Sequence, residues 1–376
     1  SYLYVAQKIQ EDFQYALDNV RTDDTKRQVN KYVVGAYMSR EMLYHATWLK
    51  YHGTTVGPTS EKVADGDIKN LLQGAINGAE VVMNSGIYSI GNTYNALFTT
   101  DDLANNPEVI WYREYTSGLQ CNALMSYNGP EDQTQGGVTQ DVINTYLCSD
   151  GLPIGQSPLY QGKEDPSIQK SFQDRDPRLY HTVIPPYKVK SGKGDYPTWS
   201  YTDNPADREY IDIMGANESC SNPGVGMKRL PGQNWSASLV PEIPRLGTGA
   251  FVTCRSGYYV WKNWDNWETS FNNGNLNTAD KPIFKIEEVL LNEAEAKFEL
   301  GVFDQGVADK TINKLRDRAG VVKMVVADIN DSFDPNRGKY YPKGNESGIL
   351  VDPVLWEIRR ERIIELMGEG FGIYDI

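Results

Sequence analysis

The chain has 376 residues, which is enough to bury a full hydrophobic core in one large domain or two ordinary ones. Acidic residues outnumber basic ones by 50 to 37, for a formal net charge of −13, which argues against nucleic-acid binding because phosphates need a basic surface. No apolar run reaches the roughly 18 residues of a membrane-spanning helix. The chain has 24 Tyr and 8 Trp but only 10 Phe. Because Tyr and Trp combine an apolar ring with a polar group, this excess indicates a surface that binds something.

The spacing of apolar residues in the N-terminal part predicts three helices, over 3–20, 30–51 and 61–84. Asn30 suits the N-cap of the second helix, and Gly86 suits a left-handed turn that closes the third. The second helix carries Tyr37, Tyr44 and Trp48, which we assign to packing within a helical scaffold.

Residues 87–282 have a different character, because Gly, Pro, Asn and Asp recur every few positions. The regular elements predicted here are short, namely strands at 109–115, 183–184 and 258–261 and a helix at 139–148. The segment also holds most of the tryptophans, which are Trp111, Trp199, Trp235, Trp261, Trp264 and Trp267. These large rings predict a folded, loop-rich region, and long ordered loops commonly carry function.

Helices return in the C-terminal part, at 283–300 and 304–319, and a last helix begins at Asp352-Pro353. The short connection at Gly301 predicts that the first two lie antiparallel, and the Asp-Pro pair is an N-cap followed by a proline at the first helical position. Helix pairs at both ends indicate a mainly α fold with a tetratricopeptide-like scaffold. The 34-residue Trp-Leu-Gly-Tyr signature of that repeat is absent.

Six segments of the chain follow one another in an order that is typical of a single family. They are YNALFTTDDLANNPEVIWYREY (94–115), NTYLCSDGLPI (144–154), FQDRDPRLYHTVIPP (172–186), KIEEVLLNEAEAKFELG (285–301), INKLRDRAGV (312–321) and LWEIRRERIIELMGEG (355–370). Together they resemble the motifs of the SusD/RagB family, the outer-membrane nutrient-binding lipoproteins of Bacteroidetes.

The resemblance implies a single SusD-like domain, with a helical scaffold at 1–86 and 283–376 and a loop-rich ligand-binding region at 87–282. It also implies a lipid-anchored protein at the cell surface, on the outer membrane. Such a protein captures oligosaccharides, or peptides in some relatives, for a SusC-like TonB-dependent transporter and has no catalytic activity. Family members normally carry an N-terminal anchor segment and continue beyond the last motif. We therefore expect both ends to be missing here, and expect membrane contact only through an anchor outside this chain.

The charged side chains of these motifs are interpreted as structural. Glu361 and Glu365 could be paired catalytic carboxylates, but together with Arg362 they fit better an Arg–Glu ladder that ties their helix to its neighbours. In Asp176-Pro177-Arg178-Leu179 we expect a fixed turn, with Arg178 bridging carboxylates or carbonyls and Leu179 entering the core.

No motif for catalysis, metal binding or a cofactor stands out. The histidines are His45, His52 and His181, and the first two lie two helical turns apart, which is too far to share a metal. The cysteines Cys121, Cys148, Cys220 and Cys254 include no CxxC pair, which disfavours zinc. We expect mostly free thiols rather than two disulfides, no cofactor and no metal.

The aromatic residues between 196 and 267 form the predicted ligand site. They lie among Gly, Pro, Asn and Asp, and Trp261, Trp264 and Trp267 are three residues apart. Sugar rings have apolar C–H faces that lie on aromatic planes, while Asn, Asp and Arg bind the hydroxyl groups at the edge. The predicted ligand-binding residues are Tyr196, Trp199, Tyr201, Trp235, Trp264 and Trp267. Ordinary core packing is the alternative for each of them.

Three other functions stay open at this point. The protein could capture peptides, as RagB-like relatives do. It could be an α-helical glycoside hydrolase that uses the same aromatic residues with two carboxylates. It could also be an interaction scaffold whose helix pairs bind only protein.

Overall fold

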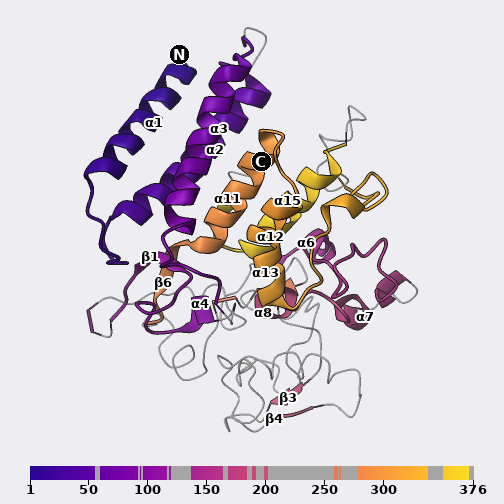
Figure 1. Cartoon of the computed structure of the whole chain (residues 1–376). Helices are drawn as coiled ribbons and strands as arrows, with labels where there is room; N and C mark the ends of the chain where they lie inside the picture. The colour runs from indigo at the N-terminus through magenta and orange to yellow at the C-terminus, as the bar shows by residue number, and fades with distance from the viewer. Residues whose placement is uncertain are drawn as a thin grey trace.

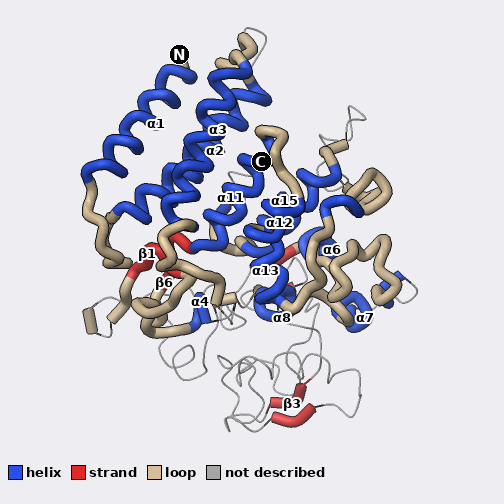
Figure 2. Tube along the Cα trace, viewed as in Figure 1, coloured by secondary structure: helices blue, strands red, loops and turns tan. Residues whose placement is uncertain are grey.

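The computed structural model is mainly helical, with three two-stranded antiparallel sheets among the residues that it describes (Figures 1 and 2). Those residues are 1–55, 60–91, 94, 96–116, 118–119, 137–163, 168–183, 189–191, 199–201, 258–260, 262–263, 278–337 and 350–371. The predicted fold class, mainly α-helical with short β pieces, is confirmed.

Three long helices stand side by side at the N-terminal end, namely α1 (Tyr2–Asn19), α2 (Lys31–His52) and α3 (Asp65–Met83) (Figure 1). Asn30 caps α2 as predicted, because its side chain accepts hydrogen bonds from the backbone N–H groups of Tyr32 and Val33. Gly86 follows α3 with φ 72°, the left-handed conformation that was predicted. The predicted start of α3 was four residues too early, since Ala64 is its N-cap.

Two glycines allow α2 and α3 to cross in close contact. A Cβ atom on Gly78 would lie 2.6 Å from the carbonyl oxygen of Gly35, and one on Gly35 would lie 2.8 Å from the carbonyl oxygen of Gly78. Neither position has room for a side chain, so the two backbones touch directly. The helices around this crossing enclose a core that includes Ala6, Met38, Met42, Leu71, Leu72 and Ala75.

The C-terminal helices pack beside α2 and α3. They are α11 (Ile286–Glu299), α12 (Gln305–Lys310), α13 (Ile312–Ala319) and α15 (Pro353–Glu365). Asp352 caps α15 by accepting from Val354 N at 2.8 Å, as predicted. The predicted helix at 304–319 is divided at Thr311, whose φ of −123° and ψ of −93° are not helical.

The predicted helix at 283–300 is wrong at its start, because Lys281–Lys285 form strand β6. This strand pairs with β1 (Val109–Arg113), a neighbour far away in sequence, and periodicity within one segment carries no information about such a partner. The pair lies at the foot of α2 and α11, where the core side chains Phe284 and Ile110 pack together (Figure 1).

The remaining elements of the middle region are short. Strands β2 (Gly137–Val138) and β5 (Tyr258–Tyr259) form one pair, and β3 (Val189–Ser191) and β4 (Trp199–Tyr201) form another. The helices are α4 (Ala96–Thr99), α6 (Gln140–Thr145), η1 (Gln161–Lys163), α7 (Ile168–Phe172) and α8 (Pro177–Thr182), and one further short helix, η3 (Val326–Asp328), lies in the C-terminal part. The predicted strands at 109–115 and 258–261 are confirmed in shorter form. At 183–184 the described part is a single bridge from Val183 to Val260, and Ile184 lies outside the described residues.

Candidate functional site

Arg178 of the D-P-R-L segment is the centre of a buried ion-pair network. Asp176 caps α8 by accepting from the backbone N–H of Arg178, and it also binds the guanidinium Nη2 at 2.7 Å. The Nη1 atom donates to Glu361 Oε1 at 2.6 Å and to Glu365 Oε2 at 2.8 Å, both on α15. None of these four side chains is more than 1% exposed. The predicted bridging role of Arg178 and the structural role of both glutamates are confirmed.

Two arginines of α13 extend this network to other elements. Arg316 donates to Glu361 at 3.0 Å, and Arg318 donates hydrogen bonds to Glu108 before β1, Glu287 on α11 and Glu365 on α15. The cations opposite Glu361 and Glu365 therefore come from α8 and α13. Arg362, which was expected to belong to the same ladder, donates to Asn292 on α11 at 2.8 Å.

The charges of this network strongly shift two carboxyl pKa values, in opposite directions. Burial alone would raise the pKa of Glu365, but Arg318, Arg178 and Lys285 together lower it to about 2. Burial, and then the neighbouring Glu287, raise the pKa of Glu108 to about 9 despite Arg318. Glu361 and Glu365 are fully buried and each is bound by two arginines, so their oxygens cannot reach a substrate and they are not a catalytic pair.

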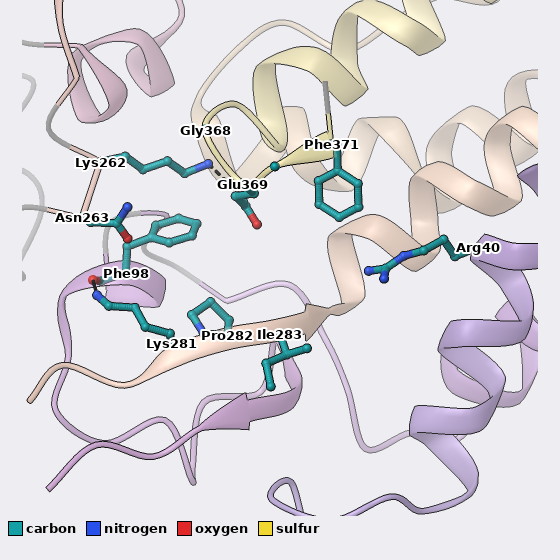
Figure 3. Close-up of a pocket in the computed structure, with 11 residues that line it drawn as sticks. Arg40, Phe98, Lys262, Asn263, Lys281, Pro282, Ile283, Gly368, Glu369 and Phe371 are labelled. Atoms are coloured by element: carbon teal, nitrogen blue, oxygen red, sulfur yellow. Dashed lines mark hydrogen bonds and ion pairs between the residues drawn. The ribbon is translucent and has the colours of Figure 1, made fainter. Parts of the chain in front are cut away.

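A hollow of about 390 Å³ lies where α2, α4, β6 and the turn after α15 meet (Figure 3). Its apolar surfaces are contributed by Phe98, Pro282, Ile283 and Phe371, and its polar groups by Arg40, Lys262, Asn263, Lys281 and Glu369. Figure 3 shows Arg40 reaching in from one side and the Lys262–Glu369 pair facing it from the other. The combination of ring faces and a few polar groups is typical of small-molecule sites.

Glu369 is the carboxylate that organises one wall of the hollow. It accepts from Lys262 at 2.7 Å and from Lys285 at 2.7 Å. Lys262 also donates to the carbonyl oxygens of Glu365 and Met367, and its ammonium group lies 4.4 Å from the centroid of the Phe98 ring. Burial lowers the pKa of Lys262 to about 8. The hydrogen bonds to Glu365, Met367 and Glu369 hold the Lys262 ammonium group in place in the wall of the hollow.

Arg40 forms the opposite wall. Its Nε and Nη2 atoms donate to Glu288 at 2.5 and 2.6 Å. Its guanidinium group lies 4.1 Å from the centroid of Phe284 and 5.2 Å from that of Phe371. Among the described residues, its Nη1 atom has no hydrogen-bond partner, so one edge of the guanidinium group is available to a ligand.

Sequence reasoning did not single out this hollow. Its residues come from five separate segments, and only Glu369, between Gly368 and Gly370, carried a local signal. Glycines on both sides of a charged residue indicate a tight turn that presents the side chain; here both have positive φ, 77° and 90°.

The predicted ligand-binding aromatics are mostly outside the described residues. This is the case for Tyr196, Trp235, Trp264 and Trp267, whereas the backbones of Trp199 and Tyr201 form β4 and pair with Ser191 and Val189 of β3. In Figure 1 this pair lies at the end of the molecule opposite to the N-terminus of α1. Whether these six residues bind a ligand stays a prediction.

The other sequence-based expectations concern metals, thiols and membrane spans. No cluster of His, Cys, Asp or Glu in the described ranges is arranged to hold a metal ion, and no helix within them is long and apolar enough to cross a membrane. Cys148 is a buried free thiol, and the other three cysteines lie outside the described residues. His45 accepts a hydrogen bond from, or donates one to, the hydroxyl of Tyr2 at 2.7 Å, which places it in the α1–α2 contact.

Comparison with known proteins points to one family. The sequence profile of the SusD family matches residues 107–376. No curated protein sequence matches the chain. A SusD-like carbohydrate-binding protein from Bacteroides fragilis is 19% identical with a TM-score of 0.58, over 99% of this chain and 57% of that one.

Two further solved structures agree with this likeness. A second SusD-like protein from Bacteroides fragilis is 19% identical with a TM-score of 0.55, over 98% of this chain and 58% of that one. A structure with a xylogluco-oligosaccharide is 16% identical with a TM-score of 0.51, over 99% of this chain and 55% of that one. These likenesses show a shared fold, and the chain spans little more than half the length of each solved relative.

Proposed function

We propose, from the premise that this chain belongs to the SusD family, that it binds oligosaccharides and does not degrade them. The observation that carries the proposal is the family match, because residues 107–376 include the whole tryptophan-rich region from Trp111 to Trp267. The solved relatives support it, since one is a carbohydrate-binding protein and another is a complex with a xylogluco-oligosaccharide.

The binding surface that we propose consists of Tyr196, Trp199, Tyr201, Trp235, Trp264 and Trp267. If three of these rings stack on sugar faces, each contributes roughly 0.5–1.5 kcal/mol. Together with a few hydrogen bonds this gives about 4–8 kcal/mol, which corresponds to dissociation constants between millimolar and micromolar. Binding of this strength permits capture and also release.

The cellular role that we propose is delivery of the captured glycan to a SusC-like TonB-dependent transporter. The protein would act at the surface of the outer membrane, held by a lipid anchor outside this chain. Family membership supports this role. Co-purification with a SusC-like TonB-dependent transporter tests it, and a protein that is recovered only from the periplasm would contradict it.

Calorimetry on tryptophan variants tests the binding proposal. A glycan array first selects a ligand, and Trp199→Ala, Trp235→Ala and Trp264→Ala are then compared with Trp48→Ala. Trp48 is a matched control because it packs in the scaffold against Tyr2 and Tyr44. We expect at least two of the three loop variants to lose about fivefold or more in affinity, which corresponds to about 1 kcal/mol, with little change in melting temperature. Unchanged affinity in all three would refute the site.

A reducing-sugar assay on the same ligand separates binding from hydrolysis. Sustained release of reducing ends, proportional to protein concentration, would show a glycoside hydrolase and contradict the proposal. A blank glycan array together with saturable binding to a peptide library would favour the peptide-capturing alternative.

A further inference from the structure

The hollow beside Glu369 lies next to the proposed glycan surface in the chain. Two of its lining residues, Lys262 and Asn263, directly precede Trp264. The volume of about 390 Å³ is near the lower end of the roughly 300–1,000 Å³ of small-molecule sites, which suits one or two sugar residues.

The surfaces of the hollow match the two sides of a sugar ring. Ile283 is 38% exposed and Pro282 and Phe371 are partly exposed, so these three form the apolar floor, whereas Phe98 is 3% exposed and has the Lys262 ammonium group over its ring. An apolar C–H face of a pyranose can lie against such a floor. The polar groups stand at the edge, where ring hydroxyls would point.

The charged groups around the hollow determine which kind of sugar it can bind. Glu369 already accepts from Lys262 and Lys285, and Glu288 accepts from two nitrogens of Arg40. Each carboxylate in these contacts is therefore already paired with a cation. Glu41, half-buried beside Arg40, is the further carboxylate in its surroundings.

Among the residues that line the hollow, Arg40, Lys262 and Lys281 are cations and Glu369 is the one carboxylate. This local excess of positive charge lies in a chain whose net charge is −13. The Nη1 edge of Arg40, without a partner among the described residues, is a donor of the kind that binds a carboxylate.

We infer that this hollow is a subsite for a carboxylate-bearing sugar residue, with the carboxylate on the Nη1 edge of Arg40 and the ring against Ile283 and Phe371. The inference rests on the proposed glycan-binding function and deepens it, because it names acidic glycans as the ligand class. A neutral sugar would make the same ring contacts without the ionic one.

Saturation-transfer NMR with two matched pairs of sugars tests the inference on the full chain. The pairs are glucuronate against glucose and galacturonate against galactose. We expect the uronates to bind in the millimolar range and at least about tenfold more tightly than their neutral partners. Equal affinity within either pair, or no detectable uronate binding, would overturn the inference.

Substitution at Ile283 locates the uronate. Ile283→Trp places a large ring in the hollow, and Ile87→Trp is the matched control because both isoleucines are 38% exposed and Ile87 lies outside the lining. Uronate binding should be lost in Ile283→Trp and kept in Ile87→Trp. Binding that survives in Ile283→Trp contradicts the assignment.

A charge-balanced pair of substitutions tests Arg40 without leaving Glu288 as an unpaired buried carboxylate. In Arg40→Gln/Glu288→Gln both partners become neutral, so the double variant lacks the ion pair but contains no unpaired buried charge. Uronate affinity should fall to the level of the neutral sugar, and an unchanged preference for the uronate would contradict the role of Arg40. If neutral oligosaccharides bind on the glycan array but uronates bind no more tightly than neutral sugars, the inference on acidic sugars fails and the proposed function stands. If no glycan on the array binds, the proposed function fails.

Discussion

Replacing Arg178 by methionine should destabilise the protein severely. Methionine fills similar space but leaves Asp176 without its guanidinium partner, and it removes one cation each from Glu361 and Glu365. All three carboxylates are fully buried. Breaking a buried pair by removing one partner typically costs about 3–5 kcal/mol. We expect a loss in this range, since Arg316 and Arg318 still hold the two glutamates while Asp176 has lost its arginine.

Urea unfolding at pH 7, followed by circular dichroism, measures this loss. Arg359→Met is the matched control, because Arg359 is on α15 but is 39% exposed and lies 3.7 Å from Glu295. An exposed pair of this kind contributes less than about 1 kcal/mol. A difference between the two variants of under about 1 kcal/mol would refute the view that the network holds the fold together.

The pH dependence of the same loss gives a second test. The pKa of Glu365 is lowered to about 2 in the folded protein, so its ionic contribution is present above about pH 4.5 and is lost as the pH falls through 2. Without Arg178 this pKa moves back toward its ordinary value. The stability gap between wild type and Arg178→Met should therefore be largest above pH 5 and narrow below 4.5. A constant gap would contradict the ionic explanation.

Two further predictions concern stability. The pKa of Glu108 is raised to about 9, so the folded state keeps a proton that the unfolded chain releases above about pH 4.5, and this contribution to stability declines by up to about 1.4 kcal/mol per pH unit as the pH rises towards 9. Glu108→Gln should flatten the stability profile between pH 5 and 8 in urea titrations, and an unchanged slope would refute this. Gly78→Ala should cost roughly 1–3 kcal/mol, because its Cβ would lie 2.6 Å from a backbone oxygen, whereas Gly66→Ala in open space on α3 should cost nothing. Equal melting temperatures for the two glycine variants would contradict the close crossing.

The helices were predictable because their signals are local. Asn30 and Asp352 satisfy N–H groups two or three residues away, and the apolar stripes repeat within each helix. Strand β6 was missed because its partner, β1, is about 170 residues away, and its own residues continue an apolar pattern that also suits a helix. The division at Thr311 was missed for a related reason, since the helical pattern runs through it.

The charged core shows a different limit of sequence reasoning. The pattern IRRERIIEL indicated that Glu361 and Glu365 are structural, and this is confirmed. Their partners come from the D-P-R-L segment, nearly 190 residues upstream, and from α13, so the identity of each pair depends on the tertiary fold. The hollow was unpredictable for the same reason, as its lining is assembled from five segments.

The position of the buried ion pairs explains how one scaffold can carry a long loop region. Glu108, Arg178 and Lys262 belong to the middle region, at three separate places along it. Each contacts the same short stretch of the C-terminal part, residues 361–369, either directly or through Arg318. Together with the Lys285–Glu369 ion pair, these contacts fasten the chain at points between which the aromatic-rich segments lie in the sequence.

This arrangement separates the stability of the fold from the chemistry of the loops. Substitutions at the fastening points leave buried charges without partners, so they are costly. If the proposed binding surface is right, substitutions of ring residues between those points should remove ligand contacts and leave the fastening contacts in place. The contrast between Arg178→Met, which should strongly destabilise the protein without any ligand being involved, and Trp264→Ala, which should weaken glycan binding at nearly constant stability, follows from this separation. If Trp264→Ala instead lowered stability as much as Arg178→Met, the tryptophan would belong to the core and the proposed division between scaffold and binding surface would be wrong.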